Sequence, residues 1–298
     1  MAGWFGKGDF MNAGDIAFPH LGIYFHDVPV SFSVFGFKIA FYGLFIGIGV
    51  MAGLLTAVQV AKKTGQDPDD YWDFAIWAVL FSVIGARIYY VIFSWEDYRN
   101  DLLGIFRLRS GGLAIYGGVI AAFITLFVWC RIKKKNPLLI GDTAMPGLIL
   151  GQAIGRWGNF MNREVFGDYY NGLFSMQIPI ADVRDYSDIT EKIAANIPEG
   201  ANYINVHPTF LYESVWNLMI FALLLIYRKH KRFDGELCLL YLGGYGVGRF
   251  LIEGIRTDTL FIPGTTVPVS QVLALVMVVF AVAADIVVRI RMSRAAES

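Results

Sequence analysis

The chain has 298 residues, of which 56% are hydrophobic and only 17% are charged, and its formal net charge at pH 7 is zero. Soluble domains usually carry about 25% charged residues, and a neutral chain lacks the basic excess that favours nucleic-acid binding. With two cysteines, Cys130 and Cys238, it has no disulfide framework to rely on. The composition indicates an integral membrane protein with no nucleic-acid partner.

The apolar residues fall in long runs, several of them close to the ~20 residues that a helix needs to cross the hydrocarbon core. In chain order the predicted spans are 39–61, 74–94, 111–130, 143–162, 208–227, 236–255 and 267–288. Strands cannot replace these helices, because open sheet edges are not satisfied in lipid. The ~10-residue alternating segments of a membrane barrel are not seen either. We therefore predict an all-α integral membrane protein with seven transmembrane helices.

Basic clusters follow the first, third, fifth and seventh predicted spans, so seven spans place all of them on one side of the membrane. They are Lys62 with Lys63, Arg131 with Lys133 to Lys135, Arg228 to Arg232, and Arg289 to Arg294. Lysine and arginine accumulate on the cytoplasmic side. The predicted topology therefore has an external N-terminus and a cytoplasmic C-terminus.

Two segments are predicted to lie outside the membrane. Residues 1–38 are rich in aromatic side chains and are expected to form an external or interfacial N-terminal arm. Residues 39–298 form the transmembrane domain, with an external insertion at about 163–206 between spans four and five. Short apolar runs in that insertion predict a small external subdomain with a few strands.

Ionisable residues inside the predicted spans ask for a reason, because each costs about 3 kcal/mol on insertion scales. With the predicted topology, Arg87, Arg156 and Arg249 lie in the outer halves of spans two, four and six. Polar residues in the outer halves of other spans are Tyr42, Tyr116 and Glu213. Polar residues that served only packing would have no reason to gather at one depth. We expect a polar site in the outer half of the bilayer.

Span six carries the most informative charge pattern. Arg249, Glu253 and Arg256 are spaced i, i+4 and i+7, which places them on one helix face. A structural ion pair accounts for Glu253 equally well, but it does not account for the second arginine. Arginine forks suit phosphate oxygens, and Arg156 adds a third cation. The residues alone predict a site for an anionic lipid headgroup, in either an enzyme or a transporter.

Span four ends in a glycine-rich segment. The spacing of Gly151 and Gly155 is the GxxxG of close helix packing. Packing does not account for the polar residues that follow, which are Arg156, Asn159, Asn162 and Glu164. The run GRWGNFMNREVFG, residues 155–167, resembles the signature of the bacterial prolipoprotein diacylglyceryl transferases.

Shorter matches extend this resemblance over most of the chain. They are Phe41-Tyr42-Gly43, Ala86-Arg87-Ile88, Gly111-Gly112 with Tyr116-Gly117-Gly118, His207-Pro208 with Leu211-Tyr212-Glu213, and Gly248-Arg249-Phe250 with Glu253 and Arg256. The segment around 168–205 matches least, as an exposed loop should.

The resemblance implies an enzyme that transfers the diacylglyceryl group of phosphatidylglycerol to the lipobox cysteine of prolipoproteins, forming a thioether and releasing glycerol 1-phosphate. The implied partners are phosphatidylglycerol, prolipoprotein lipobox peptides and the lipid bilayer, with no cofactor. The implied location is the bacterial cytoplasmic membrane, with the site facing its outer half. An anionic-lipid transporter or flippase is the alternative, although transporters commonly show repeated halves and no repeat is visible here.

The implied chemistry assigns roles to the matched residues. It needs a thiolate and positive charge near the departing phosphate oxygen, so Arg156, Arg249 and Tyr116 are the expected catalytic residues. Many relatives have histidine in place of Tyr116, and a phenol of ordinary pKa near ~10 is a poor base at neutral pH. Positioning the headgroup, or an interfacial packing role, are the alternatives for Tyr116.

Further residues are expected to bind substrate. Besides Arg156 and Arg249 they are Tyr42, Arg87, Asn159, Asn162, Glu164, Gly167, His207, Glu213, Glu253 and Arg256. His207 precedes a proline, and a capping role suits it equally well. No histidine has the spacing to a cysteine or carboxylate cluster that a metal site needs, so no metal is predicted.

Overall fold

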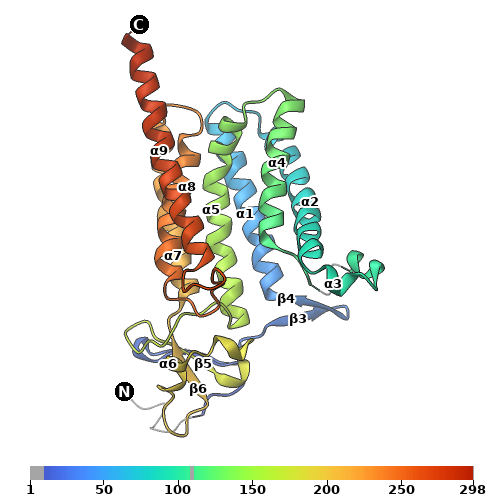
Figure 1. Cartoon of the computed structure of the whole chain (residues 1–298), viewed down its shortest axis with the longest axis vertical. Coiled ribbons are helices and arrows are strands. Elements are labelled where there is room, and N and C mark those ends of the chain that lie inside the picture. The colour runs from blue at the N-terminus through green and yellow to red at the C-terminus, as the bar shows by residue number, and fades with distance from the viewer. Residues whose placement is uncertain (1–9, 108–110, 298) are drawn as a thin grey trace. The chain divides into compact units, whose positions relative to one another are not determined.

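The computed structural model describes residues 10–107 and 111–297 (Figure 1), so residues 1–9 of the expected N-terminal arm lie outside it. The chain divides into two compact units. Unit 1 holds the residues up to Gly53 and those from Met145 onward, and unit 2 runs from Leu54 to Ala144. Each unit is described by itself.

The fold is mostly helical. The long helices are α1 (Phe41–Lys63), α2 (Pro68–Phe93), α4 (Ile115–Lys133), α5 (Pro137–Asn162), α7 (Thr209–Tyr227), α8 (Glu236–Glu253) and α9 (Val269–Glu297). Among the described residues, the six other than α8 are long and apolar enough to cross a membrane. Helix α8 coincides with the sixth predicted span, but its 18 residues include Glu236, Arg249 and Glu253. The chain is therefore a helical, multi-pass membrane protein.

The remaining elements are short. They are β1 (Ile16–Phe18), η1 (Pro19–Leu21), β2 (Ile23–Phe25), β3 (Ser31–Val34), β4 (Phe37–Ala40), α3 (Trp95–Tyr98), η2 (Leu102–Phe106), β5 (Met176–Pro179), η4 (Ile180–Asp182), η5 (Tyr186–Asp188), α6 (Glu191–Ala194), β6 (Tyr203–Val206) and η6 (Arg228–His230).

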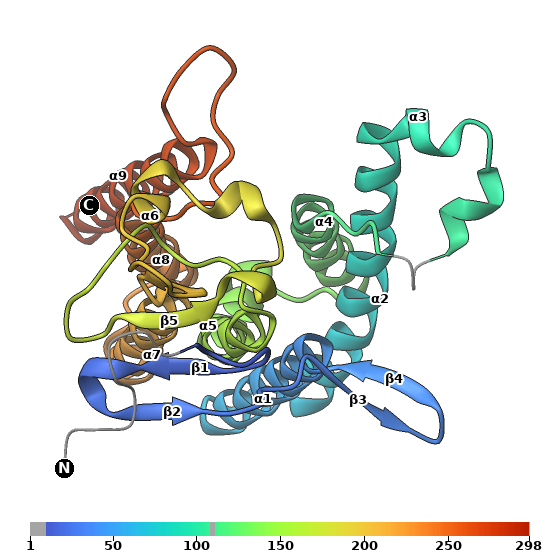
Figure 2. The ribbon, with the colours of Figure 1, turned by 90° about the horizontal axis from the view of Figure 1, so that it is seen from below.

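A four-stranded antiparallel sheet in unit 1 has the order β2-β1-β5-β6. Figure 2 shows β2, β1 and β5 side by side. The N-terminal segment therefore supplies two strands to the sheet that residues 176–206 complete. The sequence predicts strands in the later segment, but it gives no sign that residues 16–25 pair with them.

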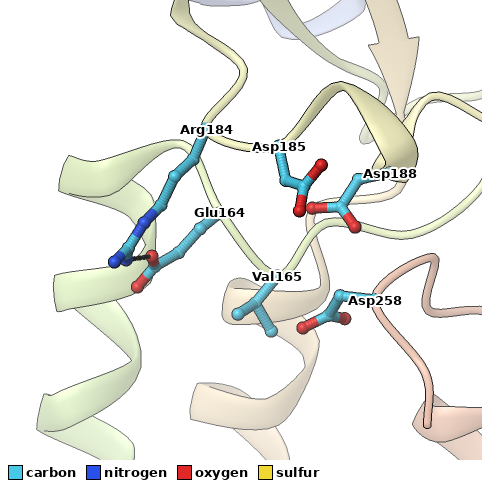
Figure 3. Close-up of a pocket in the computed structure, with 6 residues that line it drawn as sticks. All are labelled: Glu164, Val165, Arg184, Asp185, Asp188 and Asp258. Carbon is cyan, nitrogen blue, oxygen red and sulfur yellow. Dashed lines mark hydrogen bonds and ion pairs between the residues drawn. The ribbon is translucent and has the colours of Figure 1, made fainter. Parts of the chain in front are cut away.

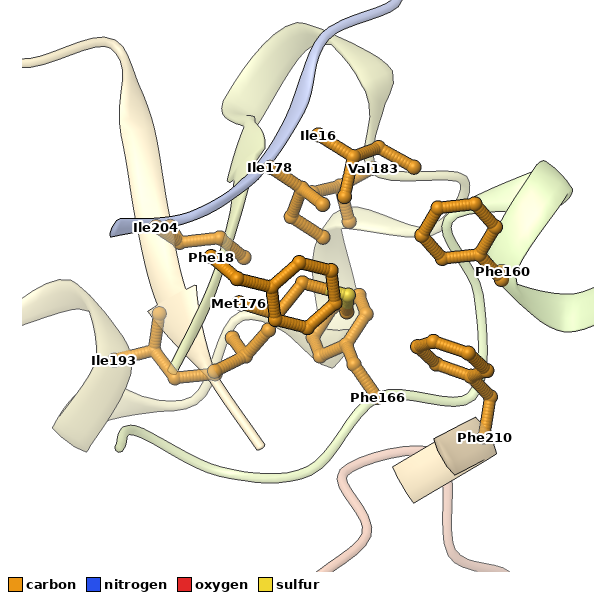
Figure 4. Packing of buried hydrophobic residues seen from close by; sticks show 11 residues of the cluster. Ile16, Phe18, Phe160, Phe166, Met176, Ile178, Val183, Ile193, Ile204 and Phe210 are labelled. Atoms are coloured by element: carbon orange, nitrogen blue, oxygen red, sulfur yellow. The ribbon is translucent and has the colours of Figure 1, made fainter. Parts of the chain in front are cut away.

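Two long helices contribute side chains from their ends to the hydrophobic core of this sheet. Phe160 at the end of α5 and Phe210 at the start of α7 lie in one buried cluster with side chains of β1, β5 and β6 (Figure 4). The two aromatic rings lie 4.9 Å apart between centroids. The sheet is thus attached to the helix ends that carry the polar residues of spans four and five.

Glycines let α1 approach α5 within unit 1. A Cβ atom built on Gly49 lies 2.7 Å from the carbonyl oxygen of Gly151, and one built on Gly155 lies 3.4 Å from the Ile46 side chain. Backbones can come this close only where one residue has no side chain. The close helix packing predicted from the GxxxG spacing is confirmed. A second cluster, with Ile149, Leu224 and Leu237 at its centre, joins α5, α7 and α8.

Unit 2 is built around the antiparallel helices α2 and α4. A Cβ atom built on Gly85 of α2 lies 2.7 Å from the carbonyl oxygen of Gly117 of α4. At one end, Tyr71, Trp129 and Cys130 are buried together, and the Trp129 indole donates to Asp73 at 3.1 Å.

Candidate functional site

Helices α5, α7 and α8 bring three arginines around one carboxylate. Glu213 of α7 forms ion pairs with Arg156 of α5, with Arg249 of α8 at 3.5 Å and with Arg256 at 3.4 Å. Glu253 pairs with Arg249 at 2.7 Å and with Arg256 at 3.8 Å. We call these five residues the arginine cluster. The predicted gathering of Arg156, Glu213 and the α8 charges at one place is present in unit 1.

The arginine cluster is nearly shielded from solvent. The side chains of Glu213 and Glu253 are 6% and 3% exposed, and that of Arg256 is 9% exposed. Charges in such a place persist only when they are paired, because an unpaired charge there costs several kcal/mol. Three arginines and two glutamates leave one positive charge in excess. Asp258 pairs with the outer side of Arg256 at 2.7 Å and is itself 27% exposed.

Arg256 reaches the cluster in a different way from the one predicted. The i, i+7 spacing places it on the α8 face, but α8 ends at Glu253. Arg256 instead forms a β-bridge with Gly167, and the neighbouring Asp168 amide donates to the Ile255 carbonyl at 2.8 Å. The loop after α5 therefore holds Arg256 in place.

Gly167 makes that contact possible. A Cβ atom at this position would lie 2.8 Å from both the His207 Cβ and the Ile255 carbonyl oxygen. Its amide donates to the His207 carbonyl at 2.9 Å. The expected substrate-binding glycine is thus a residue that positions its neighbours.

His207 lies beside the loop after α5, stacked on Tyr170 with ring centroids 4.1 Å apart. Its Nδ1 lies 3.3 Å from the Tyr212 hydroxyl. Burial lowers the pKa of His207, and the nearby Lys192 lowers it further. The ring is therefore kept neutral and is fixed by aromatic contacts.

The polar residues of the glycine-rich segment bind one another. The side-chain amides of Asn159 and Asn162 donate to Glu164 Oε1 at 3.1 and 3.2 Å. The other oxygen of Glu164 pairs with Arg184, which comes from the external segment. Sequence reasoning missed Arg184. Its contact with Glu164 depends on how the loops fold, and no sequence spacing links the two residues.

The loop itself is held in an unusual conformation. Arg163 and Val165 have positive φ values of 53° and 60°, which for a β-branched residue is a rare and strained state. The buried Arg163 guanidinium donates to the carbonyls of Gly14 and Val28, both at 2.6 Å, and the Thr209 hydroxyl donates to the Val165 carbonyl. Contacts with the N-terminal segment and with α7 therefore hold this loop in its strained conformation.

An open pocket of about 300 Å³ lies beside the same loop. It is lined by Glu164, Val165, Arg184, Asp185, Asp188 and Asp258 (Figure 3). Burial, together with the Asp258 and Asp185 carboxylates, raises the pKa of Asp188 to about 6. Since Asp258 also pairs with Arg256, the pocket adjoins the solvent side of the arginine cluster.

Tyr42, at the start of α1, lies against α5. Its Cδ2 would be 2.9 Å from a Cβ atom at Gly158, next to Asn159 in the chain. The structure thus brings this predicted residue to the glycine-rich segment.

Arg87 and Tyr116 belong to unit 2. The Arg87 guanidinium is buried and donates to four backbone carbonyls, those of Gly104, Ile105, Gly111 and Gly112, at 2.7 to 2.9 Å. Gly111 and Gly112 have positive φ, and a Cβ atom at Gly112 would collide with Arg87. Arg87 therefore holds the backbone of residues 104–105 and 111–112 against α2. Tyr116, in the first turn of α4, is 41% exposed.

Within residues 10–107 and 111–297, no three His, Cys, Asp or Glu side chains are grouped so that they could hold a metal ion. The chemistry that the cluster offers is electrostatic: arginine forks at low exposure beside loops rich in polar groups.

Comparison with known proteins identifies the chain's relatives. A family model described as "Prolipoprotein diacylglyceryl transferase" matches residues 29–287. Proteins named phosphatidylglycerol--prolipoprotein diacylglyceryl transferase are similar over most of their length. That of Finegoldia magna is 40% identical over 84% of this chain and 91% of its own. That of Clostridioides difficile is 38% identical over 86% and 94%, and that of Listeria monocytogenes is 41% identical over 89% and 91%.

Proposed function

The chain belongs to the prolipoprotein diacylglyceryl transferase family, and on this premise we propose that it transfers the diacylglyceryl group of phosphatidylglycerol to prolipoproteins. The acceptor is the thiol of the lipobox cysteine. The products are a thioether-linked lipoprotein precursor and glycerol 1-phosphate.

The observation that carries this proposal is the arginine cluster. A phosphodiester has one negative charge, and Arg156 and Arg249 are the cations of the cluster that it can approach, since Asp258 already pairs with Arg256. Phosphate oxygens suit the same arginine forks that now hold carboxylates. Arg156 and Arg249 expose 19% and 18% of their side chains, more than Arg256, so they are the arginines accessible to a headgroup.

The reaction follows from this binding mode. The thiolate sulfur attacks the carbon of the diacylglyceryl group that bears the phosphate. The bond between that carbon and the phosphate oxygen breaks, and its electron pair goes to the oxygen. The departing phosphate gains a second negative charge, balanced by the proton that the thiol gives up. Arg156 and Arg249 stabilise that charge as it develops, while Glu213 and Glu253 keep the guanidinium groups oriented. The two glutamates bind substrate only through the arginines.

The other predicted residues have supporting roles in this proposal. Asn159, Asn162 and Glu164 form the polar edge of the site, and Gly167 and His207 fix the loop beside Arg256. Tyr42 packs where α1 meets this segment. In unit 2, Arg87 orders the loop that leads to Tyr116, and we propose that the Tyr116 hydroxyl positions the headgroup or accepts the thiol proton.

The same proposal includes a seven-span topology with the N-terminus outside. The contacts of Arg289 near the end of α9 support α8 as a membrane span, the sixth of seven in chain order. This guanidinium pairs with Glu236, the first residue of α8, and Glu236 accepts from Tyr227, the last residue of α7, at 2.8 Å. The end of α7, the start of α8 and the end of α9 are thus at one level, so α8 runs antiparallel to both neighbours. The basic side would face the cytoplasm, and the arginine cluster the outer half of the cytoplasmic membrane.

The test is release of glycerol 1-phosphate by purified protein in detergent, given phosphatidylglycerol and a lipobox peptide. We expect peptide-dependent release from wild type, and loss of release in Arg156→Lys and Arg249→Lys, which keep the charge but lose the fork. Arg99→Ala, which removes an exposed arginine paired with Glu96, is the matched control. Binding of phosphatidylglycerol by well-folded wild type without any release would contradict the proposal and favour a lipid carrier.

A further inference from the structure

The hairpin of β3 and β4 separates its side chains by polarity. Its register pairs Phe32 with Ile39 and Val34 with Phe37, whereas the alternate pairs are Ser31 with Ala40 and Ser33 with Lys38. Directly paired residues point to the same side of a hairpin, and successive pairs to opposite sides. One face is therefore made of four large apolar side chains, and the other of small and polar ones.

Within residues 10–107 and 111–297, little covers the apolar face and the tip of this hairpin. Phe37 is 61% exposed, and Phe35 at the tip is 98% exposed. Phe35 and Gly36 form the two-residue turn and have φ values of 49° and 81°. A left-handed conformation is unfavourable for a residue with a side chain, so Phe35 occupies a position that local conformation disfavours. In water, the exposed Phe35 ring makes no apolar contact that could offset this unfavourable backbone conformation.

A two-stranded ribbon is at best marginally stable in water, so its apolar face needs a covering. The hairpin is joined without a linker to α1, which begins at Phe41, directly after β4. The Phe41 amide donates to the Val30 carbonyl at 3.0 Å, and the Phe41 ring lies 5.1 Å from that of Phe32. The hairpin is thus fixed to the first turn of a helix that is long and apolar enough to cross the membrane.

The length of α1 places the hairpin at the bilayer surface. Its 23 residues rise about 34 Å at ~1.5 Å per residue, close to the ~30 Å of the hydrocarbon core. Phe41 therefore lies near one boundary of the core, and β3 and β4 begin at the depth of the headgroups. Strands of four residues extend only about 13 Å further.

We propose that the β3–β4 hairpin is a membrane-interface anchor, whose apolar face and Phe35 tip insert among lipid acyl chains while Lys38 and the serines face headgroups and water. The occupant of the apolar face is the bilayer itself. Continuity with α1 argues for lipid in place of a second copy of the chain. This inference rests on membrane insertion of α1 and does not depend on the proposed transfer reaction.

Photocrosslinking in vesicles tests the anchor directly. The full chain, carrying Phe35→p-benzoylphenylalanine or Phe37→p-benzoylphenylalanine, is reconstituted in phosphatidylcholine–phosphatidylglycerol vesicles with alkyne-tagged acyl chains and irradiated. We expect lipid adducts at both positions. The same substitution at Ser33, on the polar face, and at Tyr186, an exposed residue of η5, should give several-fold fewer adducts.

Other outcomes would overturn the anchor. Crosslinked dimers at position 35 or 37 in place of lipid adducts would assign the face to a second copy. Crosslinks to a precursor peptide that displace lipid adducts would assign it to substrate. Equal lipid labelling at positions 33, 35, 37 and 186 would show that the apolar face has no preferred contact with acyl chains. Because wild-type glycerol 1-phosphate release is measured separately, failure of the anchor is distinguishable from failure of the transfer reaction.

Discussion

Glu213 determines the charge state of the arginine cluster, because its carboxylate contacts Arg156, Arg249 and Arg256. Removing one member of a buried ion pair leaves an uncompensated charge and costs about 3–5 kcal/mol. We therefore expect Glu213→Gln to lower the unfolding temperature in detergent and to abolish glycerol 1-phosphate release. Glu96→Gln, at a surface pair with Arg99, should change stability by less than about 1 kcal/mol. A Glu213→Gln protein as stable as wild type would show that the arginines do not depend on this carboxylate.

Asp188 gives the external pocket a pH dependence. Its pKa is near 6 in the folded protein against 3.8 for the ordinary side chain, so the folded state holds the extra proton between these values. Stability from this group is therefore greatest at low pH and is lost as pH rises through about 6. We expect Asp188→Asn to raise the unfolding temperature at pH 7.5, by an amount corresponding to about 1 kcal/mol after solvent screening, and to have little effect below pH 3.8, where the carboxyl is protonated in both states.

Asp185→Asn is the matched control for Asp188→Asn, because the pKa of Asp185 is shifted in the opposite direction. The Asp185 carboxylate accepts hydrogen bonds from the Ser187 amide and hydroxyl at 2.9 and 2.7 Å, and these bonds lower its pKa. The substitution should lower the unfolding temperature at pH 7.5. If both variants shifted stability in the same direction at that pH, the assigned cause of the Asp188 shift would be wrong.

The membership of the arginine cluster could be predicted from sequence, whereas the partners of Glu164 could not. Arg249, Glu253 and Arg156 are marked by charge inside apolar runs, where every such residue needs a reason. Glu164 accepts from Asn159 and Asn162 only because the chain turns back through two positive-φ residues after α5. That turn is held by contacts with Gly14 and Val28, which no local pattern reveals.

At the scale of elements, apolar runs locate helices but not their ends. The run predicts a span over 74–94, while α2 begins at Pro68. The first turn contains Asp69 and Asp70, and Asp67 caps it by accepting from the Asp69 amide at 3.0 Å. Acidic residues and proline favour a helix N-terminus, but they lower the hydropathy by which spans are recognised.

The α1–α5 contact makes a prediction about one helix face. Gly49 approaches Gly151, whereas Gly47, also on α1, has open space where a side chain would be. We expect Gly49→Leu to force the helices apart, to lower the unfolding temperature and to reduce glycerol 1-phosphate release. Gly47→Leu should be neutral, since its side chain would meet open space. Equal effects of the two substitutions, measured by thermal unfolding, would mean that backbone contact does not hold α1 to α5.

The loop that Arg87 orders offers a second test at this scale. Gly112 and Gly65 both have positive φ, so alanine strains the backbone at either position. At Gly112 the new Cβ also collides with Arg87 and Tyr90, while at Gly65 it meets nothing within 4 Å. We expect Gly112→Ala to expose residues 104–107 and 111–112 to protease and to destabilise unit 2, by more than the ~1 kcal/mol strain of Gly65→Ala. Comparable protease sensitivity in both variants would remove this role from Arg87.

At the scale of the whole molecule, pairings between distant segments could not be predicted from the sequence. Residues 16–25 look like an interfacial arm because they are short and aromatic, yet β1 pairs with β5. Arg289 and Glu236 are 53 residues apart, and nothing in their local sequence shows that they meet. The sequence predicts the segment of α8 as the sixth span, and the pairing of Arg289 with Glu236 supports that prediction.

The topology can be checked by labelling single cysteines in intact cells with a membrane-impermeant maleimide, in a Cys130→Ala, Cys238→Ala background. If α8 crosses the membrane, His230→Cys between α7 and α8 and Ala296→Cys in α9 share the cytoplasmic side and react only after lysis. Thr266→Cys, in the loop between α8 and α9, should react in intact cells. With six spans and α8 confined to one surface, positions 230 and 266 would react alike and position 296 differently. That result would also put the basic end of α9 outside, against the preference of lysine and arginine for the cytoplasm, and would require Arg289 and Glu236 to separate.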